Sequence, residues 1–101
     1  RLSERENNAL SVRVELQADC YAGLWAKKAH ESRQILQTGD IEEAMNAAAR
    51  IGDDAIQRQS TGHVRPDSFT HGSSAQRTKW FNVGLQTGSV KACDTFSQRE
   101  L

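Results

Sequence analysis

The chain has 101 residues, of which 37% are hydrophobic and 26% are charged. These proportions are typical of one modest globular domain and argue against an intrinsically disordered chain. Thirteen lysines and arginines balance thirteen aspartates and glutamates, so bulk charge gives no support to the binding of nucleic acid or of an anionic membrane. The longest apolar run, at residues 20–26, is far shorter than the ~20 residues that a transmembrane helix needs.

Residues 3–30 are predicted to form a long first helix. Ser3 and Glu6 have the spacing of a capping box, in which the hydroxyl and the carboxylate each accept a backbone N–H. One apolar stripe recurs at steps of three or four residues: Leu10, Val14, Ala18, Tyr21 and Trp25. A second stripe contains Leu16, Cys20 and Leu24. The two stripes predict a helix that is buried on more than one side. Apolar and charged residues alternate at residues 12–16, a pattern that would also suit a strand.

The remaining predicted elements are shorter. Gly39 is expected to stop one helix, and Asp40 to open the next with an acidic first turn. The apolar face of that helix consists of Ile41, Ala44, Met45, Ala48 and Ile51. Residues 52–54 interrupt it, a short helical turn around Ile56 follows, and residues 61–72 form an ordered loop. A last helix is capped at Ser73 or Ser74, carries Trp80 and ends at Gly88.

These signals predict an all-α fold of three to four helices, with Trp25 and Trp80 in the core. Residues 1–101 are expected to form a single helical domain. The chain begins at Arg1 in polar sequence without an initiator methionine. That start is expected to be a cut in a longer protein.

The three histidines, His30, His63 and His71, do not form a metal-binding pair. None lies four residues from another, so no helix face presents two imidazoles. The run from His30 to Gln34 imitates the first half of the motif HExxH, but an amide stands where the second histidine is needed. We therefore interpret that run as coincidence, and His63 as part of the loop.

Glu15 and Asp19 are the most informative acidic residues. They lie one helical turn apart, so both carboxylates project from the same face within an otherwise apolar segment. One interpretation is a solvated acidic patch. The other is a metal site, in which Glu15 binds zinc and Asp19 accepts a hydrogen bond from a zinc-ligating histidine.

Residues 11–26 (SVRVELQADCYAGLWA) resemble the segment that follows the HExxH helix in the putative neutral zinc metallopeptidase family. Four later phrases are similar to phrases of that family, in the same order: residues 39–44 (GDIEEA), 51–54 (IGDD), 67–77 (DSFTHGSSAQR) and 93–96 (CDTF). The resemblance therefore extends from about residue 11 to residue 96 and combines several rare phrases.

The resemblance implies the C-terminal part of a zincin-like, specifically gluzincin-like, endopeptidase that acts on proteins or peptides. In such enzymes two histidines and a general-base glutamate come from HExxH, and a later glutamate is the third zinc ligand. Glu15 matches that third ligand, and Asp19 matches the carboxylate that accepts a hydrogen bond from a zinc-ligating histidine. This chain lacks HExxH, so we expect zinc in a longer parent protein, but neither bound zinc nor hydrolysis in the 101-residue chain alone.

The resemblance also implies further roles. His71 and Arg77 are candidates for stabilising the oxyanion of the tetrahedral intermediate; the alternatives are that His71 orders the loop and that Arg77 pairs with an acid. An exported or membrane-anchored parent is implied, on the periplasmic side in a bacterium, where a Cys20–Cys93 disulfide would persist. The alternative for the two cysteines is a pair of buried thiols that behave as small hydrophobic residues. The rival interpretation of the whole chain is a helical interaction or structural module without catalysis.

Overall fold

The computed structural model describes residues 2–34, 37 and 39–101. Within this part of the chain there are four α-helices: α1 (Glu4–Arg33), α2 (Asp40–Ile51), α3 (Asp53–Thr61) and α4 (Ser74–Thr87). Three short 3₁₀ turns, at Pro66–Ser68, Lys91–Cys93 and Thr95–Ser97, complete the fold. No strand occurs among the described residues, so the predicted all-α class is confirmed. None of their helices is long and apolar enough to cross a bilayer.

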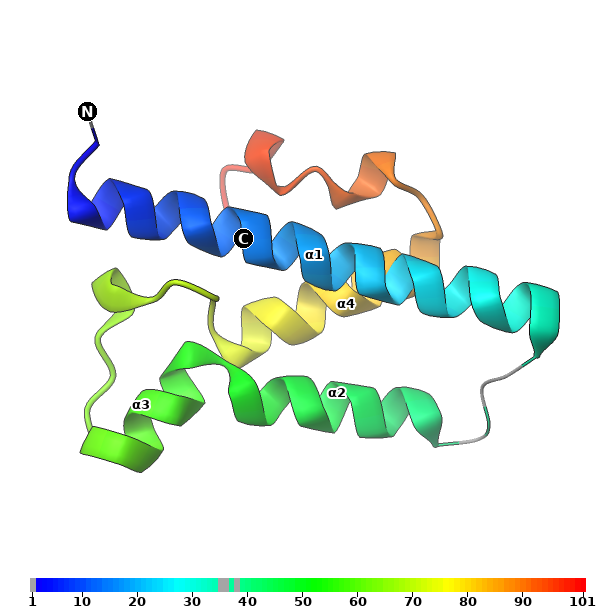
Figure 1. The fold of residues 1–101 in the computed structure, drawn as a ribbon, viewed down its shortest axis with the longest axis horizontal. Helices are drawn as coiled ribbons and strands as arrows, with labels where there is room; N and C mark the ends of the chain where they lie inside the picture. The colour runs from blue at the N-terminus through cyan, green and yellow to red at the C-terminus, as the bar shows by residue number, and fades with distance from the viewer. Residues whose placement is uncertain (1, 35–36, 38) are drawn as a thin grey trace.

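The long helix α1 organises the molecule. It runs almost the full length of the structure, with α4 packed along its middle (Figure 1). Helices α2 and α3 lie on one side of this pair, and the C-terminal 3₁₀ turns lie on the other (Figure 1). The result is a flat assembly of 44 × 31 × 17 Å, with a correspondingly thin core.

The helix ends follow the predicted caps with one exception. Ser3 with Glu6, and Ser73 with Gln76, each form a complete capping box, and Gly88 ends α4 in a left-handed conformation. The predicted stop at Gly39 was wrong. Helix α1 already ends at Arg33, where Gln34 adopts the left-handed conformation, and Gly39 is the N-cap of α2.

Two glycines allow the backbones of α1 and α4 to touch. A Cβ atom added to Gly84 would lie 1.8 Å from the carbonyl oxygen of Cys20, and one added to Gly23 would lie 2.0 Å from that of Phe81. Both distances are far inside van der Waals contact, so only glycine fits at either position. The two helices therefore cross at backbone contact, without intervening side chains.

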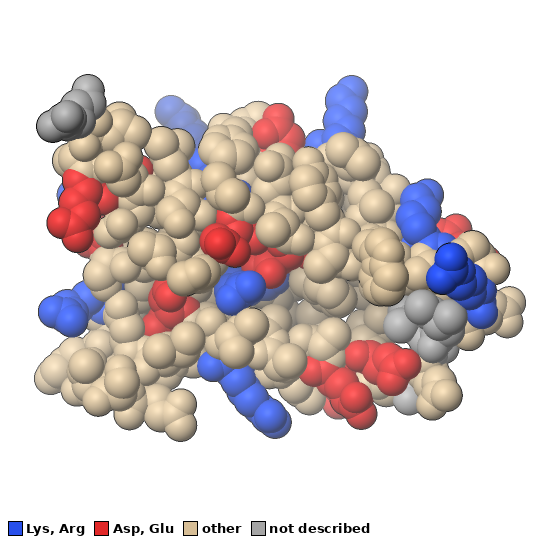
Figure 2. Space-filling view, viewed as in Figure 1, with Lys and Arg blue, Asp and Glu red and all other residues tan. Residues whose placement is uncertain are grey.

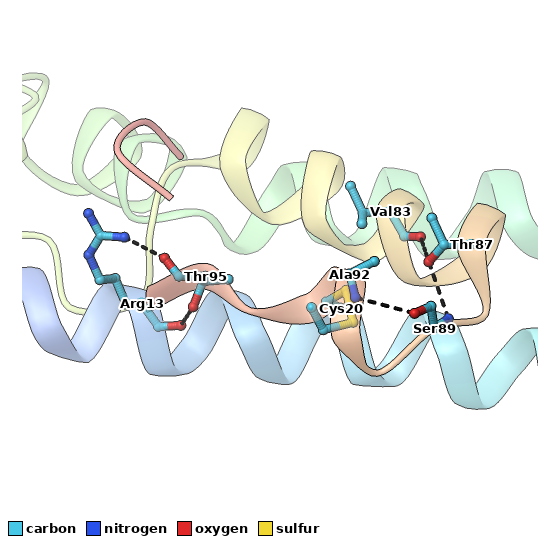
Figure 3. Close-up of a disulfide and its surroundings, with 8 residues drawn as sticks. Arg13, Cys20, Val83, Thr87, Ser89, Ala92 and Thr95 are labelled. Carbon is cyan, nitrogen blue, oxygen red and sulfur yellow. Dashed lines mark hydrogen bonds between the residues drawn. A yellow bond between two sulfur atoms is a disulfide. The ribbon is translucent and has the colours of Figure 1, made fainter. Parts of the chain in front are cut away.

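The core lies next to this crossing. It consists of Val12, Leu16, Cys20, Phe69, Trp80 and Cys93. The Cys20 and Cys93 sulfurs are joined in a disulfide, the pair that the family resemblance implied (Figure 3). Two turns earlier on α1, Arg13 donates from Nη1 to the carbonyl oxygen of Thr95, whose hydroxyl donates back to the Arg13 carbonyl at 2.6 Å (Figure 3). The disulfide and this reciprocal pair fasten the C-terminal segment to α1.

One predicted apolar stripe is not buried. The large residues of the first stripe on α1, Leu10, Val14, Tyr21 and Trp25, are between 41% and 64% exposed. The prediction that Trp25 belongs to the core was wrong, whereas Trp80, at 4% exposed, does belong to it. The periodicity correctly marks an apolar face, but α4 and the C-terminal segment cover only the side of α1 that carries Leu16 and Cys20.

The glycine crossing generates a stability prediction. Gly84→Ala should destabilise the chain by about 1–3 kcal/mol or more, because the new methyl group forces α1 and α4 apart. Alanine normally favours a helix over glycine by about 1 kcal/mol, so the sign of the effect is diagnostic. Chemical denaturation should show the loss, while Gln86→Ala, at an exposed site on α4, should stay within about 0.5 kcal/mol of the wild type. A stabilised Gly84→Ala variant would contradict the close crossing.

The disulfide generates a second prediction. It joins residues 73 apart in sequence, and closing a loop of that length stabilises a fold by up to about 4 kcal/mol in the chain-entropy model. Reduction should therefore lower the midpoint of urea unfolding markedly. Equal midpoints with and without reductant, together with two titratable thiols in the untreated protein, would show that the bond does not form.

Candidate functional site

Glu15 and Asp19 lie on the flank of α1, between its core face and its exposed face. Both side chains are half-buried, and each precedes a fully buried core residue, Leu16 or Cys20. Because side chains four residues apart on a helix are neighbours, the two carboxylates lie side by side, as the sequence predicted.

Arg77 of α4 holds Asp19 through two parallel hydrogen bonds. Its Nε donates to Oδ2 at 2.9 Å, and its Nη2 donates to Oδ1 at 3.0 Å. Both side chains are largely shielded from water. This is the fork-to-fork geometry that fixes both groups in orientation as well as in distance. The predicted alternative for Arg77, pairing with an acid, is therefore what the structure contains.

Several acidic groups act on Arg77. Hydrogen bonding to Asp19 raises the pKa of Arg77 against the lowering effect of burial, and the charges of Asp19, Glu15 and Asp53 raise it further. The guanidinium is therefore a permanent positive charge at the centre of this cluster. Figure 2 shows acidic and basic side chains meeting in the middle of this face, over the seam between α1 and the α2–α3 pair.

Asp53 organises the loop that precedes α4. Its Oδ2 accepts three backbone N–H groups, from Thr70 at 2.9 Å, His71 at 2.7 Å and Gly72 at 2.9 Å. Its own backbone N–H donates to the carbonyl oxygen of Gly72 at 2.8 Å. The first residue of α3 thereby ties residues 70–72 to the start of that helix.

Asp54, the next residue of α3, binds the backbone at the start of α4. Its Oδ1 accepts the backbone N–H of Ser74 at 2.8 Å. Burial raises the pKa of Asp54, but hydrogen bonds from the backbone N–H groups of Ser74 and Ala55 and from the Ser74 hydroxyl outweigh it, so the net shift is downward. Gly52 lies so close to Ser74 that an added Cβ would be 2.1 Å from its nitrogen. The run Gly52-Asp53-Asp54 therefore joins α3 to the start of α4.

His71 occupies this loop beside Asp53. Its Nδ1 lies 3.0 Å from the Thr70 hydroxyl and 3.5 Å from Oδ1 of Asp53, and its side chain is 53% exposed. The structure thus groups the predicted residues around two carboxylates: Arg77 with Asp19, and His71 with Asp53.

Asp53 is the residue that sequence reasoning missed. The sequence predicts for residues 52–54 only an interruption after the second helix and a resemblance to the family. In the structure the interruption is Gly52 alone, because Asp53 and Asp54 are the first residues of α3. The only available signal was a pair of acidic residues at a helix start, which usually serves the helix dipole. Here the carboxylate also binds a loop 17–19 residues away.

The described residues do not contain a complete metal site. No group of three or more histidine, cysteine, aspartate or glutamate side chains among them could hold a metal ion. The run from His30 to Gln34 offers no substitute, because α1 ends at Arg33 and Gln34 leaves the helix. The described residues alone therefore do not supply the three protein ligands that a catalytic zinc site needs.

Comparison with known proteins finds one matching family and several relatives. The family model described as "Putative neutral zinc metallopeptidase" matches residues 1–96. The uncharacterised protein YpfJ of Escherichia coli K12 is 54% identical over 98 residues, which are 95% of this chain and 33% of that protein. The uncharacterised protein Mb2605 of Mycobacterium bovis is 52% identical over 99 residues, covering 89% of this chain and 34% of that protein.

This chain thus spans about a third of the length of these relatives. No solved structure matches it. Because the family model covers nearly the whole chain, the chain belongs to the putative neutral zinc metallopeptidase family.

Proposed function

We propose that this chain is the part of a longer zinc-dependent endopeptidase that supplies the third zinc ligand, Glu15. The observation that carries the proposal is the half-buried face of α1, on which Glu15 lies one turn before the clamped carboxylate of Asp19. The histidine ligands would come from another part of the longer protein, since this chain covers only a third of its relatives.

The surroundings of Glu15 suit a ligand. Among the described residues, nothing hydrogen-bonds or ion-pairs with its carboxylate, so both oxygens are available. A neighbouring positive charge, Arg77, compensates part of the acidic cluster. An anionic oxygen is a good zinc donor when imidazoles complete the tetrahedron, and Glu15 alone provides only one of those positions.

Asp19 suits the role of orienting a histidine. Arg77 uses one lone pair on each of its oxygens, and a carboxylate has about four such sites. Each oxygen can therefore accept a further N–H, such as that of a zinc-bound imidazole. Because Arg77 grips both oxygens, the carboxylate plane is fixed before any histidine arrives, which is what an orienting partner requires.

Arg77 and His71 are our candidates for stabilising an oxyanion. The Nη1 group of Arg77 has only a 3.5 Å contact with the carbonyl oxygen of Ile51, which is too long for a strong hydrogen bond. It therefore keeps donor capacity. His71 is half exposed and tied to the protein through its Nδ1 side.

The substrate class and compartment are also proposals. Membership of a peptidase family supports a protein or peptide as substrate. The Cys20–Cys93 disulfide supports an exported or membrane-anchored parent, in a compartment such as the periplasm, because disulfides persist in oxidising surroundings.

The exposed stripe on α1 favours one second candidate, a helical interaction module without catalysis. Leu10, Val14, Tyr21 and Trp25 offer apolar area that another polypeptide could cover. Both candidates need a partner for this stripe, but only the peptidase needs HExxH. An HExxH motif in the parent gene, upstream of the codon for Glu15, would favour the peptidase; a parent gene without one would favour the module.

The proposal predicts the effect of Glu15→Gln in the longer protein. The substitution should weaken zinc binding and abolish proteolysis, because an amide brings no negative charge to the metal. Zinc content after dialysis and peptidase activity measure both effects. Glu42→Gln, at an exposed site on α2, is the matched control and should change neither. Wild-type zinc content and activity in Glu15→Gln would show that the ligand assignment is wrong.

Asp19→Asn should have a smaller effect than Glu15→Gln. The zinc ligands survive, but a histidine loses its charged acceptor, which typically costs about 10–100-fold in metal affinity or activity. Circular dichroism of the same sample separates this effect from unfolding. If Asp19→Asn simply unfolds, the carboxylate serves mainly to pair with Arg77.

The isolated 101-residue chain should retain no stoichiometric zinc after dialysis. One carboxylate cannot replace two imidazoles, and the described residues offer no group of three donors. Inductively coupled plasma mass spectrometry provides the measurement. One zinc ion per chain would contradict the prediction that this chain alone cannot hold zinc. The variants His63→Gln and His71→Gln would then show whether either histidine is a ligand.

A further inference from the structure

The pairing of Asp53 with His71 defines more than the position of a loop. One oxygen of Asp53, Oδ2, is occupied by three backbone N–H groups from residues 70–72. The other oxygen, Oδ1, faces Nδ1 of His71 at 3.5 Å. The Asp53 side chain is only 14% exposed, so the carboxylate is held rigidly and its second oxygen cannot turn away.

This arrangement constrains where a neutral His71 carries its proton. If the proton were on Nε2, the lone pair of Nδ1 would face the negative oxygen of Asp53. If the proton is on Nδ1, its partial positive charge lies beside that oxygen instead. A contact of 3.5 Å is long for a hydrogen bond, but the charge of the carboxylate still favours the second arrangement.

The Thr70 hydroxyl, 3.0 Å from the same nitrogen, does not decide between the two forms. A hydroxyl can donate to a bare Nδ1 or accept from a protonated one. A carboxylate can only accept. The choice between the forms therefore lies with Asp53.

We propose that Asp53 is a positioning residue that holds neutral His71 in the Nδ1–H form, with Nε2 unprotonated. This inference rests on the proposed function for its role in catalysis. Among the described residues no group hydrogen-bonds to Nε2, and the side chain is 53% exposed. Nε2 is therefore the ring nitrogen that would be available to a substrate.

The tautomer defines what His71 can do. In its neutral form Nε2 accepts a proton and cannot donate a hydrogen bond to an oxyanion. Only the imidazolium, with Nδ1–H toward Asp53 and Nε2–H toward the substrate, stabilises an oxyanion. In the longer protein, His71 would therefore stabilise an oxyanion only as the imidazolium, whose positive charge Asp53 would compensate.

The experiment measures the imidazole nitrogens of the 101-residue chain by NMR, after labelling the histidines with ¹⁵N. At a pH where the rings are neutral, the ¹⁵N shifts show which nitrogen carries the proton. His71→Gln assigns the signals, and the exposed His63 is an internal reference. The wild type should show mainly the Nδ1–H form for His71. A dominant Nε2–H form would overturn the proposal.

Asp53→Asn tests the cause. The amide oxygen must take over the three backbone N–H groups, because an NH₂ group there would face three donors. The NH₂ group then faces Nδ1 and donates to it, so the dominant form of His71 should reverse to Nε2–H. Asp54→Asn is the matched control, since Asp54 binds the backbone of Ser74 and should leave the tautomer unchanged. An unchanged tautomer in Asp53→Asn, or a reversal in Asp54→Asn, would contradict the proposal.

Thr70→Val keeps the test decisive if Asp53→Asn does not fold. Removing the hydroxyl should leave the Nδ1–H form of His71 dominant. If Thr70→Val instead shows mainly the Nε2–H form, Thr70 determines the tautomer and the proposal is overturned. The readout needs neither metal nor substrate. Failure of this inference therefore leaves the Glu15 proposal standing, and failure of the Glu15 proposal does not change the expected tautomer.

Discussion

The backbone contact between α1 and α4 at Gly23 and Gly84 sets the spacing of the two helices that carry the core and the candidate site. In a molecule 17 Å thick in its shortest dimension, there is little core to hold two helices in register. Direct backbone contact does so without bulky side chains. It brings α4 close enough for Arg77 to grip both oxygens of Asp19. The disulfide from Cys20 adds a covalent link on the same stretch of α1.

Two of the three carboxylates in the candidate site hold parts of the fold together. Asp19 and Asp53 each use a carboxylate to join segments far apart in sequence: Asp19 joins α1 to α4, and Asp53 joins α3 to the loop before α4. Glu15 is different, because nothing among the described residues binds it. Asp19 and Asp53 thus hold the structure together, whereas the Glu15 carboxylate is available, which is the property a metal ligand needs.

Local chemistry was predictable from the sequence. The capping boxes at Ser3 and Ser73 depend on residues three apart, and the shared face of Glu15 and Asp19 depends on one helical turn. The Asp19–Arg77 and Asp53–His71 pairs span 58 and 18 residues, and no periodicity specifies such contacts. The prediction that Trp25 is buried was wrong for a related reason. A stripe shows that a face is apolar, whereas its burial depends on what packs against it.

We have proposed that the face of α1 that carries Glu15 belongs to a zinc site completed by another part of a longer protein. A structure of that longer protein with zinc, located by anomalous scattering at the zinc edge, tests it most directly. We predict a zinc ion about 2.0–2.2 Å from a carboxylate oxygen of Glu15, with two imidazoles beside it and Arg77 still paired with Asp19. A fully coordinated zinc ion with no ligand from this chain would contradict the account.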